Sequence, residues 1–357
     1  MEKMYEPFMI DNLKIKNRIV RSAMFEYGAD GGKISERIVN LYETLAKGGS
    51  GLIITGMQSV SDGAGYGPVM VKTSYDGYVD DMKKIVNIIH KYDSKVFVQL
   101  QHVGYRTNWK MGYDTFGVSE FKVSEECTYH EATQEEINKV IQDFATSALK
   151  CKEAGCDGVQ IHAAHGFLIN SFLSPHFNHR KDIYCGNIEN RARLLFEVYS
   201  AIRQAVGKDF LISVKIPFND LVSDSNTNQE MLYVCKTLEE MGIDMLEISS
   251  GITMDGGESS FTPFIKKNKE GNFLESAKLV ADSLDIPIIS VCGYRTPQFI
   301  EQVLSDTSIT AISLGRPLTR EPDLPNRWKT DKSSALCASC NRCFNSSDII
   351  SCQLLKK

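Results

Sequence analysis

Residues 158–167 read Gly-Val-Gln-Ile-His-Ala-Ala-His-Gly-Phe and place two histidines at the end of a short apolar run. The run from Gly158 to Ile161 has the length and composition of a buried strand, and His162 falls where such a strand passes into a loop. In α/β proteins, ligands bind and reactions occur at the carboxyl ends of strands. Two imidazoles there can both donate hydrogen bonds to one oxygen atom. The stretch therefore indicates a strand of a parallel sheet with a site at its end.

Seven further apolar runs are similar to this one, and the stretches between them have helical periodicity. The eight candidate strands are Arg18–Ser22, Gly51–Thr55, Lys95–Leu100, Gly158–Ile161, Phe210–Ile216, Met245–Ile248, Ile286–Val291 and Thr310–Leu314. A capping box at Thr133 opens a segment whose apolar residues share one face, and a second amphipathic helix follows Asn190. Gly207 and Gly242 stand where C-terminal caps of helices are expected.

The alternation of eight strands with helices predicts an α/β protein with a (β/α)8 TIM barrel over residues 1–330, followed by a cysteine-rich tail over residues 331–357. Such a barrel typically takes about 250 residues before insertions. A doubly wound sheet is the alternative, but it would more often show a glycine-rich dinucleotide fingerprint after its first strand. The first strand here runs into Ser22-Ala23-Met24-Phe25 without that fingerprint.

Composition excludes several classes of protein. A net charge of −5 argues against a protein that binds nucleic acid or an anionic membrane surface. No stretch approaches the ~20 uninterrupted apolar residues that a membrane helix needs, and the first residues lack the apolar core of an export signal. We therefore expect a cytoplasmic protein acting on a small molecule, in which the ten cysteines are reduced thiols or metal ligands. Assembly into a homo-oligomer is left open.

Two glycine turns follow the seventh and eighth candidate strands. Gly293 comes two residues after Val291, and Gly315 directly precedes Arg316. Loops at these positions of a barrel commonly bind phosphate through backbone N–H groups, and glycine lets the backbone approach closely. Arg316 adds a charge-assisted donor. We expect a phosphate site here; the alternative is that both glycines serve tight turns and that Arg316 pairs with a surface carboxylate.

Taken in order, these motifs resemble the old yellow enzyme family of FMN-dependent oxidoreductases. The resemblance runs from about Met4 to Pro325. It is most specific from His162 to Arg191, where His-Ala-Ala-His-Gly is followed by Phe-Leu-Ser-Pro and Glu-Asn-Arg. It implies an FMN-binding barrel in which NADH or NADPH reduces the flavin. A hydride then passes from the flavin to an activated, carbonyl-conjugated alkene.

The resemblance also implies which residues bind the flavin. They follow six of the candidate strands and are Ser22, Ala23, Met24, Gly56, Gln99, Lys215, Gly293, Gly315 and Arg316. The last three would hold the FMN phosphate. Lys215 would lie near flavin N1 and O2, where a cation stabilises the reduced flavin. The alternative for Lys215 is an ion pair with a carboxylate at a neighbouring strand end.

His162 and His165 would bind the carbonyl oxygen of the alkene, and Tyr27 would contact the substrate. Alternatives for the two histidines are a zinc site, which lacks a visible third ligand, or two satisfied core side chains. The sequence departs from the family at Phe167, where a tyrosine usually protonates the α-carbon, and at Phe25, where one branch has a cysteine. Protonation of the α-carbon would then fall to water or to another residue.

Four cysteines in the tail have a spacing that suits a metal. They are Cys337, Cys340, Cys343 and Cys352. Thiolate quartets hold [4Fe–4S] clusters or structural zinc, and larger relatives such as dienoyl-CoA reductases and trimethylamine dehydrogenase carry a cluster just after the barrel, with one residue more in the second gap. The alternatives are therefore an iron–sulfur-linked flavoprotein served by an external electron carrier, a remnant with reduced thiols, and a flavin-binding barrel without turnover.

Overall fold

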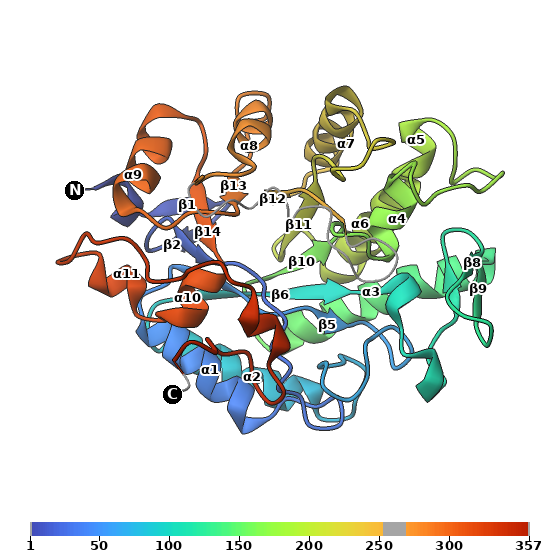
Figure 1. Cartoon of the computed structure of the whole chain (residues 1–357), viewed down its shortest axis with the longest axis horizontal. Coiled ribbons are helices and arrows are strands. Elements are labelled where there is room, and N and C mark those ends of the chain that lie inside the picture. The colour runs from blue at the N-terminus through green and yellow to red at the C-terminus, as the bar shows by residue number, and fades with distance from the viewer. Residues whose placement is uncertain (1, 253–268, 356–357) are drawn as a thin grey trace.

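The computed structural model describes residues 2–252 and 269–355, and at its centre lies a closed barrel of parallel strands (Figure 1). The eight strands are β3 (Ile19–Arg21), β4 (Leu52–Ile54), β6 (Lys95–Gln101), β10 (Gly158–His162), β11 (Leu211–Pro217), β12 (Met245–Ser249), β13 (Ile288–Val291) and β14 (Ala311–Leu314). Each pairs in parallel with its neighbours, and β14 pairs with β3, which closes the ring. All eight predicted strands are confirmed. The doubly wound alternative is wrong, because an open sheet would leave two unpaired edges.

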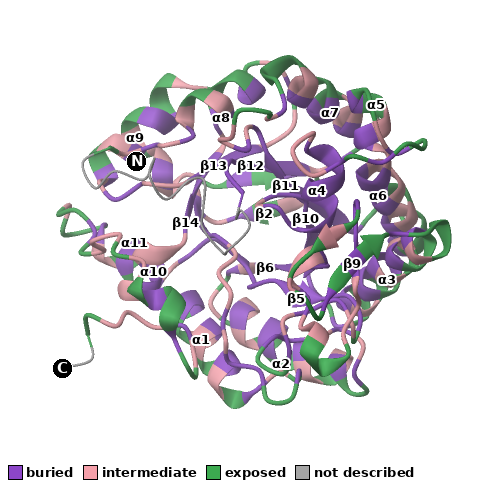
Figure 2. Ribbon diagram, turned by 45° about the vertical axis from the view of Figure 1, so that its right-hand side comes forward, coloured by how far each residue is buried: buried purple, intermediate pink, exposed green. Residues whose placement is uncertain are grey.

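Helices surround the barrel, with at least one after each strand. They are α1 (Glu36–Lys47), α2 (Tyr78–His90), α3 (Gln134–Glu153), α4 (Leu168–Leu173), α5 (Ile188–Arg191), α6 (Arg193–Val206), α7 (Asn228–Glu240), α8 (Leu274–Ala281), α9 (Pro297–Asp306), α10 (Arg316–Arg320) and α11 (Leu324–Arg327). The longer helices have buried inner faces and exposed outer faces, whereas α4 is buried along its whole length (Figure 2). Among the described helices, none combines the length and the apolar composition needed to cross a bilayer.

The helix ends follow the predicted capping signals. Thr133 Oγ1 accepts a hydrogen bond from the Glu136 amide at 3.2 Å, and the Glu136 carboxylate accepts one from the Thr133 amide at 2.8 Å. This reciprocal capping box begins α3, as predicted. Gly207 ends α6 with φ 73°, and Gly242 follows α7 with φ 88°, conformations that glycine adopts without steric cost. Both predicted C-terminal caps are confirmed.

The interior of the barrel has an apolar half and a polar half. Side chains alternate along each strand, so that every second residue points into the barrel and the others face the helices. Near the amino-terminal ends of the strands the interior is filled by Val20, Leu52, Ile54, Phe97, Leu211, Met245, Ile289 and Ala311. A hairpin of β1 (Phe8–Ile10) and β2 (Leu13–Ile15) packs onto this cluster through Phe8, Ile10 and Ile15. The sequence did not predict this hairpin, which fills the amino-terminal end of the barrel.

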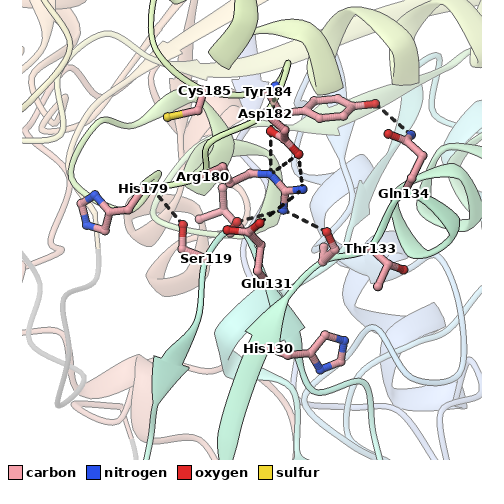
Figure 3. A network of polar contacts seen from close by, with 12 residues as sticks. Ser119, His130, Glu131, Thr133, Gln134, His179, Arg180, Asp182, Tyr184 and Cys185 are labelled. Atoms are coloured by element: carbon pink, nitrogen blue, oxygen red, sulfur yellow. Dashed lines mark hydrogen bonds and ion pairs between the residues drawn. The ribbon is translucent and has the colours of Figure 1, made fainter.

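A small sheet is inserted between β6 and α3 and is fixed by one arginine. Its strands are β7 (Phe116–Gly117), β8 (Phe121–Lys122) and β9 (Thr128–Glu131). Arg180, between α4 and α5, donates through Nη1 to the carbonyls of Val118 at 3.1 Å and Ala132 at 2.9 Å. Its Nε donates to the Asp182 carboxylate at 3.0 Å, and Figure 3 shows the guanidinium between Asp182 and Glu131. Because the guanidinium is almost fully buried, it ties the inserted sheet rigidly to the segment before α5.

The tail after residue 330 folds back onto the barrel. The Ala335 amide donates to the Arg295 carbonyl at 2.8 Å, and the Ile350 amide donates to the Glu26 carbonyl at 2.7 Å. Asp348 forms an ion pair with Arg37 at 2.9 Å. These contacts hold the described part of the tail against the loops that follow β3 and β13. The division of the chain at residue 330 stays a prediction.

Candidate active site

A cavity of about 720 Å³ opens at the carboxyl ends of the barrel strands. This is a typical volume for a site that binds a cofactor or a small ligand. With one exception, every predicted catalytic and cofactor-binding residue lines it, from Ser22 after β3 to Arg316 after β14. The strand ends thus bring together residues that are almost 300 positions apart in the sequence.

The exception is Gly56, which lies behind the cavity wall. Its amide donates to Glu26 Oε1 at 2.9 Å and lies 2.8 Å from the hydroxyl of Tyr42, which also binds Glu26. A Cβ on Gly56 would lie 2.2 Å from Glu26 Oε2 and 2.4 Å from the carbonyl oxygen of Met24. Burial raises the pKa of both Glu26 and Tyr42. Gly56 therefore makes room for a buried acid that supports the loop after β3.

The floor of the cavity holds a buried carboxylate that sequence reasoning missed. Glu247 on β12 accepts a hydrogen bond from Ser22 Oγ at 2.9 Å and one from Gln160 Nε2 at 3.1 Å. Lys215 Nζ lies 3.3 Å from Glu247 Oε2 and donates to Ser22 Oγ at 3.1 Å. Lys215 thus lines the cavity and also forms the ion pair that was the alternative for it. An acid inside the apolar run Met245–Ile248 was the available signal, because a buried charge needs a partner.

Gln99 extends this floor across the barrel. Its Nε2 donates to Gln160 Oε1 at 2.7 Å, so a chain of polar side chains joins β6, β10, β12, β11 and β3. Such a network fixes the side-chain amides in one orientation. The predicted ring-binding residues Gln99, Lys215 and Ser22 are therefore held rigidly at one end of the cavity.

The two histidines stand on the wall above this floor. His162 Nδ1 accepts the Ala164 amide proton at 3.2 Å, a contact that assigns the proton to Nε2. His165 has a left-handed backbone with φ 67°, its Nε2 lies 2.8 Å from Ser249 Oγ, and the two rings are 5.0 Å apart. Burial, together with the charge of Lys215, lowers the pKa of His162 well below its usual range and that of His165 to about 3. Both imidazoles are neutral at pH 7 and can act as hydrogen-bond donors without carrying charge.

Aromatic rings form the part of the cavity wall that adjoins His162. Phe25 packs on Tyr27 with ring centroids 4.4 Å apart and on Tyr66 at 5.6 Å. Tyr66 meets Phe167 edge to face at 6.3 Å, and Phe167 lies 5.0 Å from His162. Tyr66 comes from the loop after β5 (Gln58–Ser59) and was not predicted, because a single tyrosine in the sequence Gly-Tyr-Gly carries no signal of direction. This wall is suited to a flat, conjugated ligand.

Two other loop tyrosines had no predicted direction. Tyr294 lines the cavity, and its hydroxyl shares a hydrogen bond with Ser290 Oγ at 2.6 Å. Tyr105 binds Ser119 in the inserted sheet, with its hydroxyl accepting the Ser119 amide at 3.0 Å. Tyr105 therefore supports the insertion and does not line the cavity.

The expected phosphate loops meet at the end of the cavity beneath the tail. Gly293 has φ 91°, and a Cβ there would lie 2.2 Å from Asn272 Nδ2. The Ser313 hydroxyl is buried and has no hydrogen-bond partner among the described residues. Arg316 lines the cavity and donates through Nη1 to Asn341 of the tail, not to a surface carboxylate. A buried unpaired hydroxyl beside a guanidinium fits an anionic group such as a phosphate.

The tail cysteines are free thiols in this structure, as are the other six. Cys352 Sγ lies 3.2 Å from Arg320 Nη1, Cys340 is exposed, and burial raises the pKa of Cys343. Among the residues that the structure describes, no three His, Cys, Asp or Glu side chains are arranged to hold a metal ion. The assignment of these four thiols to a cluster or a zinc ion therefore stays a prediction.

Known proteins are similar to this chain over most of its length. A model of the family described as NADH:flavin oxidoreductase / NADH oxidase matches residues 3–334. An NADH oxidase of Thermoanaerobacter brockii is 31% identical over 341 residues, which are 93% of this chain and 52% of that protein. A cinnamate reductase of Clostridium sporogenes is 30% identical over 94% of this chain and 54% of its own length. The chain thus spans about half the length of these curated relatives.

A solved structure gives the same picture of the fold. The old yellow enzyme homologue from Zymomonas mobilis superposes with a TM-score of 0.78 and 23% sequence identity. The match covers 93% of this chain and 94% of that one. At this identity the likeness extends to the barrel architecture, which agrees with the closed ring of strands described above.

Proposed function

The chain belongs to the NADH:flavin oxidoreductase / NADH oxidase family, whose cofactor is FMN, and we propose that it is a flavin oxidoreductase that takes hydride from NADH or NADPH and delivers it to a carbonyl-conjugated alkene. Family membership confirms the resemblance to old yellow enzyme. The proposal places this reaction on a small molecule in the cytoplasm. It includes no nucleic acid, membrane or external electron carrier.

One observation carries the proposal. One cavity is lined by a rigid network of polar side chains, by two neutral histidines, and by a pair of side chains, Ser313 and Arg316, that fits a phosphate group. When bound, FMN supplies a hydride acceptor and donor. Gln99 and Lys215 would hold its ring, and Ser313 and Arg316 would hold its phosphate. Lys215 brings a positive charge that favours electron-rich flavin, as a cation near that ring does in general.

The histidines act on the other reactant. When hydride adds to the β-carbon of the alkene, negative charge builds on the conjugated carbonyl oxygen. Neutral imidazole N–H groups aimed at that oxygen stabilise the transition state more than the ground state. Because the pKa of each histidine lies far below 7, neither ring exchanges protons during the reaction at neutral pH. We assign them to binding and charge stabilisation, with Tyr27 as a further substrate contact.

The name of the cinnamate reductase supports this choice of acceptor, since cinnamate is an aryl-conjugated alkene. The aromatic wall of Phe25, Tyr27 and Tyr66 is suited to stacking against such a conjugated ring. The iron–sulfur alternative has less support, because no three His, Cys, Asp or Glu side chains among the described residues are arranged to hold a metal ion.

The test begins with anaerobic reduction of the FMN-loaded protein. We expect NADH or NADPH to bleach the flavin, and cinnamaldehyde, cinnamate or cyclohexenone to restore its colour. His162→Asn should slow reoxidation by the alkene by about 100-fold or more, as loss of an oxyanion donor does elsewhere. His130→Asn is the matched control, since His130 lies on the exposed strand β9 and pairs with Glu136. Flavin that neither nicotinamide reduces, or that no alkene reoxidises, would overturn the proposal.

A further inference from the structure

Phe167 carries no phenol at the position where the family usually has a tyrosine, but another phenol reaches this part of the cavity. Tyr66 lines the cavity and is partly buried in a cluster with Met57, Met70 and Phe167. Its ring meets the ring of Phe167 edge to face at 6.3 Å, and Phe167 lies 5.0 Å from His162. The Tyr66 phenol therefore lies on the side of the cavity where the histidines would hold the carbonyl group of the substrate.

Arg106 positions this phenol. Its guanidinium lies 5.4 Å from the centre of the Phe167 ring and is near enough to the Tyr66 hydroxyl to donate a hydrogen bond to it. Its charge also contributes to the lowered pKa of His165, so the guanidinium lies near both Tyr66 and His165. A guanidinium only donates hydrogen bonds, so the Tyr66 oxygen accepts from Arg106. The Tyr66 O–H remains the group that can donate a hydrogen into the cavity.

The electrostatics suit a proton donor. Burial raises the pKa of Tyr66 to about 12, so the phenol holds its proton at pH 7. Arg106 opposes that shift both by its charge and by its hydrogen bond, because each favours the phenolate. A donor needs both properties: it must be protonated at rest and must have its anion stabilised at the moment of transfer.

We propose that Tyr66 is the catalytic proton donor of alkene reduction and that Arg106 is its positioning residue. The inference rests on the proposed function. As hydride adds to the β-carbon, the π electrons of the alkene form a bond between the α-carbon and the Tyr66 proton. The O–H bonding pair stays on the Tyr66 oxygen as phenolate, and a proton from water then restores the phenol. No further reactant is needed.

The other cavity phenols fit this role less well. The Tyr27 ring packs on Phe25, and the pKa of Tyr27 is raised by burial and by Cys343, which places it towards the tail. Tyr294 shares its hydroxyl with Ser290 in a buried hydrogen bond of 2.6 Å.

The test compares four variants of the FMN-loaded full chain: Tyr66→Phe, Tyr27→Phe, Tyr105→Phe and a double variant. For Tyr66→Phe we expect the rate of flavin reoxidation by the alkene to fall about 100-fold or more, while reduction by NADH stays within about twofold. The alkene dissociation constant, taken from the flavin difference spectrum, should not change. Tyr105→Phe is the control, because it removes a phenol that binds Ser119 outside the cavity. The double variant Tyr66→Phe with Phe167→Tyr should recover activity by supplying a phenol on the neighbouring ring.

A second readout does not depend on turnover. In FMN-free protein labelled with ¹³C at tyrosine Cζ, the Tyr66 resonance should begin to titrate at higher pH in Arg106→Met than in the parent chain. An unchanged resonance would overturn the role of Arg106. Unchanged alkene reduction in Tyr66→Phe, equal losses in both half-reactions, or a loss confined to Tyr27→Phe would overturn the role of Tyr66. If the parent chain reduces no alkene, the proposed function itself fails, and that result is visible before any variant is compared.

Discussion

Removing either partner of the ion pair between Lys215 and Glu247 should be one of the most destabilising single substitutions in the barrel. The Glu247 side chain is fully buried and that of Lys215 is 5% exposed, with 3.3 Å between Nζ and Oε2. At that separation and an effective dielectric constant of about 20, Coulomb's law gives roughly 5 kcal/mol of attraction. Removing one partner leaves the other charge buried and unpaired, which costs about 3–5 kcal/mol. Glu247→Gln and Lys215→Met should each lower the free energy of unfolding by that amount.

Each single substitution leaves one buried group without its partner, whereas the double variant removes both charges. The double variant should therefore recover much of the lost free energy of unfolding. We expect a coupling energy of at least about 2 kcal/mol from urea unfolding of FMN-free protein at pH 7, with fluorescence and circular dichroism transitions that coincide. The control is the pair Lys139 and Asp143 on α3, which is shorter at 2.6 Å but has the lysine 64% exposed. Its coupling should be below about 0.5 kcal/mol. Equal coupling in the two pairs would refute the argument that burial outweighs distance here.

Three further predictions follow from the same structure. The pKa of His165 is about 3 in the folded chain and near 6.5 in the unfolded chain, so the unfolded chain binds one more proton between these pH values. The free energy of unfolding therefore falls as the pH drops from 6.5 towards 3. In urea titrations at several pH values, His165→Asn should flatten that slope by up to about 1.4 kcal/mol per pH unit. Gly56→Ala should cost about 2–3 kcal/mol, because its Cβ would lie 2.2 Å from a buried carboxylate, whereas Gly77→Ala, with φ 91° and no atom within 4 Å, should cost about 1 kcal/mol; thermal unfolding compares them, and equal losses would contradict the crowding argument. Arg180→Met should raise hydrogen exchange at residues 116–131 but not in α3, since it cuts the bonds to the inserted sheet; unchanged exchange there would remove Arg180 as its anchor.

The barrel could be predicted because its signals are local and repeated. Each strand is a short apolar run, and the strand–helix alternation leaves few arrangements for a parallel sheet. The Thr133 capping box and the glycines at 207 and 242 each act within one helix end, so they are readable without tertiary information. The hairpin over residues 8–15 was missed, because three-residue strands of mixed polarity are weak patterns and become strands only by packing onto the barrel interior.

The candidate site could be predicted only in part, for a related reason. His162, Lys215 and Gln99 stand near strand ends, where the alternation of side chains decides which way each one points. Tyr66 lies in a loop that no such rule covers, and Asn341 reaches the cavity from the tail only because the tail folds back. Gly56 was expected beside the flavin ring, yet its amide serves Glu26, a contact set by a buried acid whose role the sequence did not reveal.

The hairpin of β1 and β2 limits the directions from which ligands can enter the cavity. Since Phe8, Ile10 and Ile15 fill the amino-terminal end of the barrel, visiting molecules approach the cavity from the mouth above the strand ends. Under the proposed function, the nicotinamide and the alkene would then enter through the same opening and could not bind over one flavin ring at the same time. Either one in excess would competitively inhibit binding of the other. The hairpin that stabilises the barrel would thus also make reduction of the flavin and its reoxidation occur one after the other.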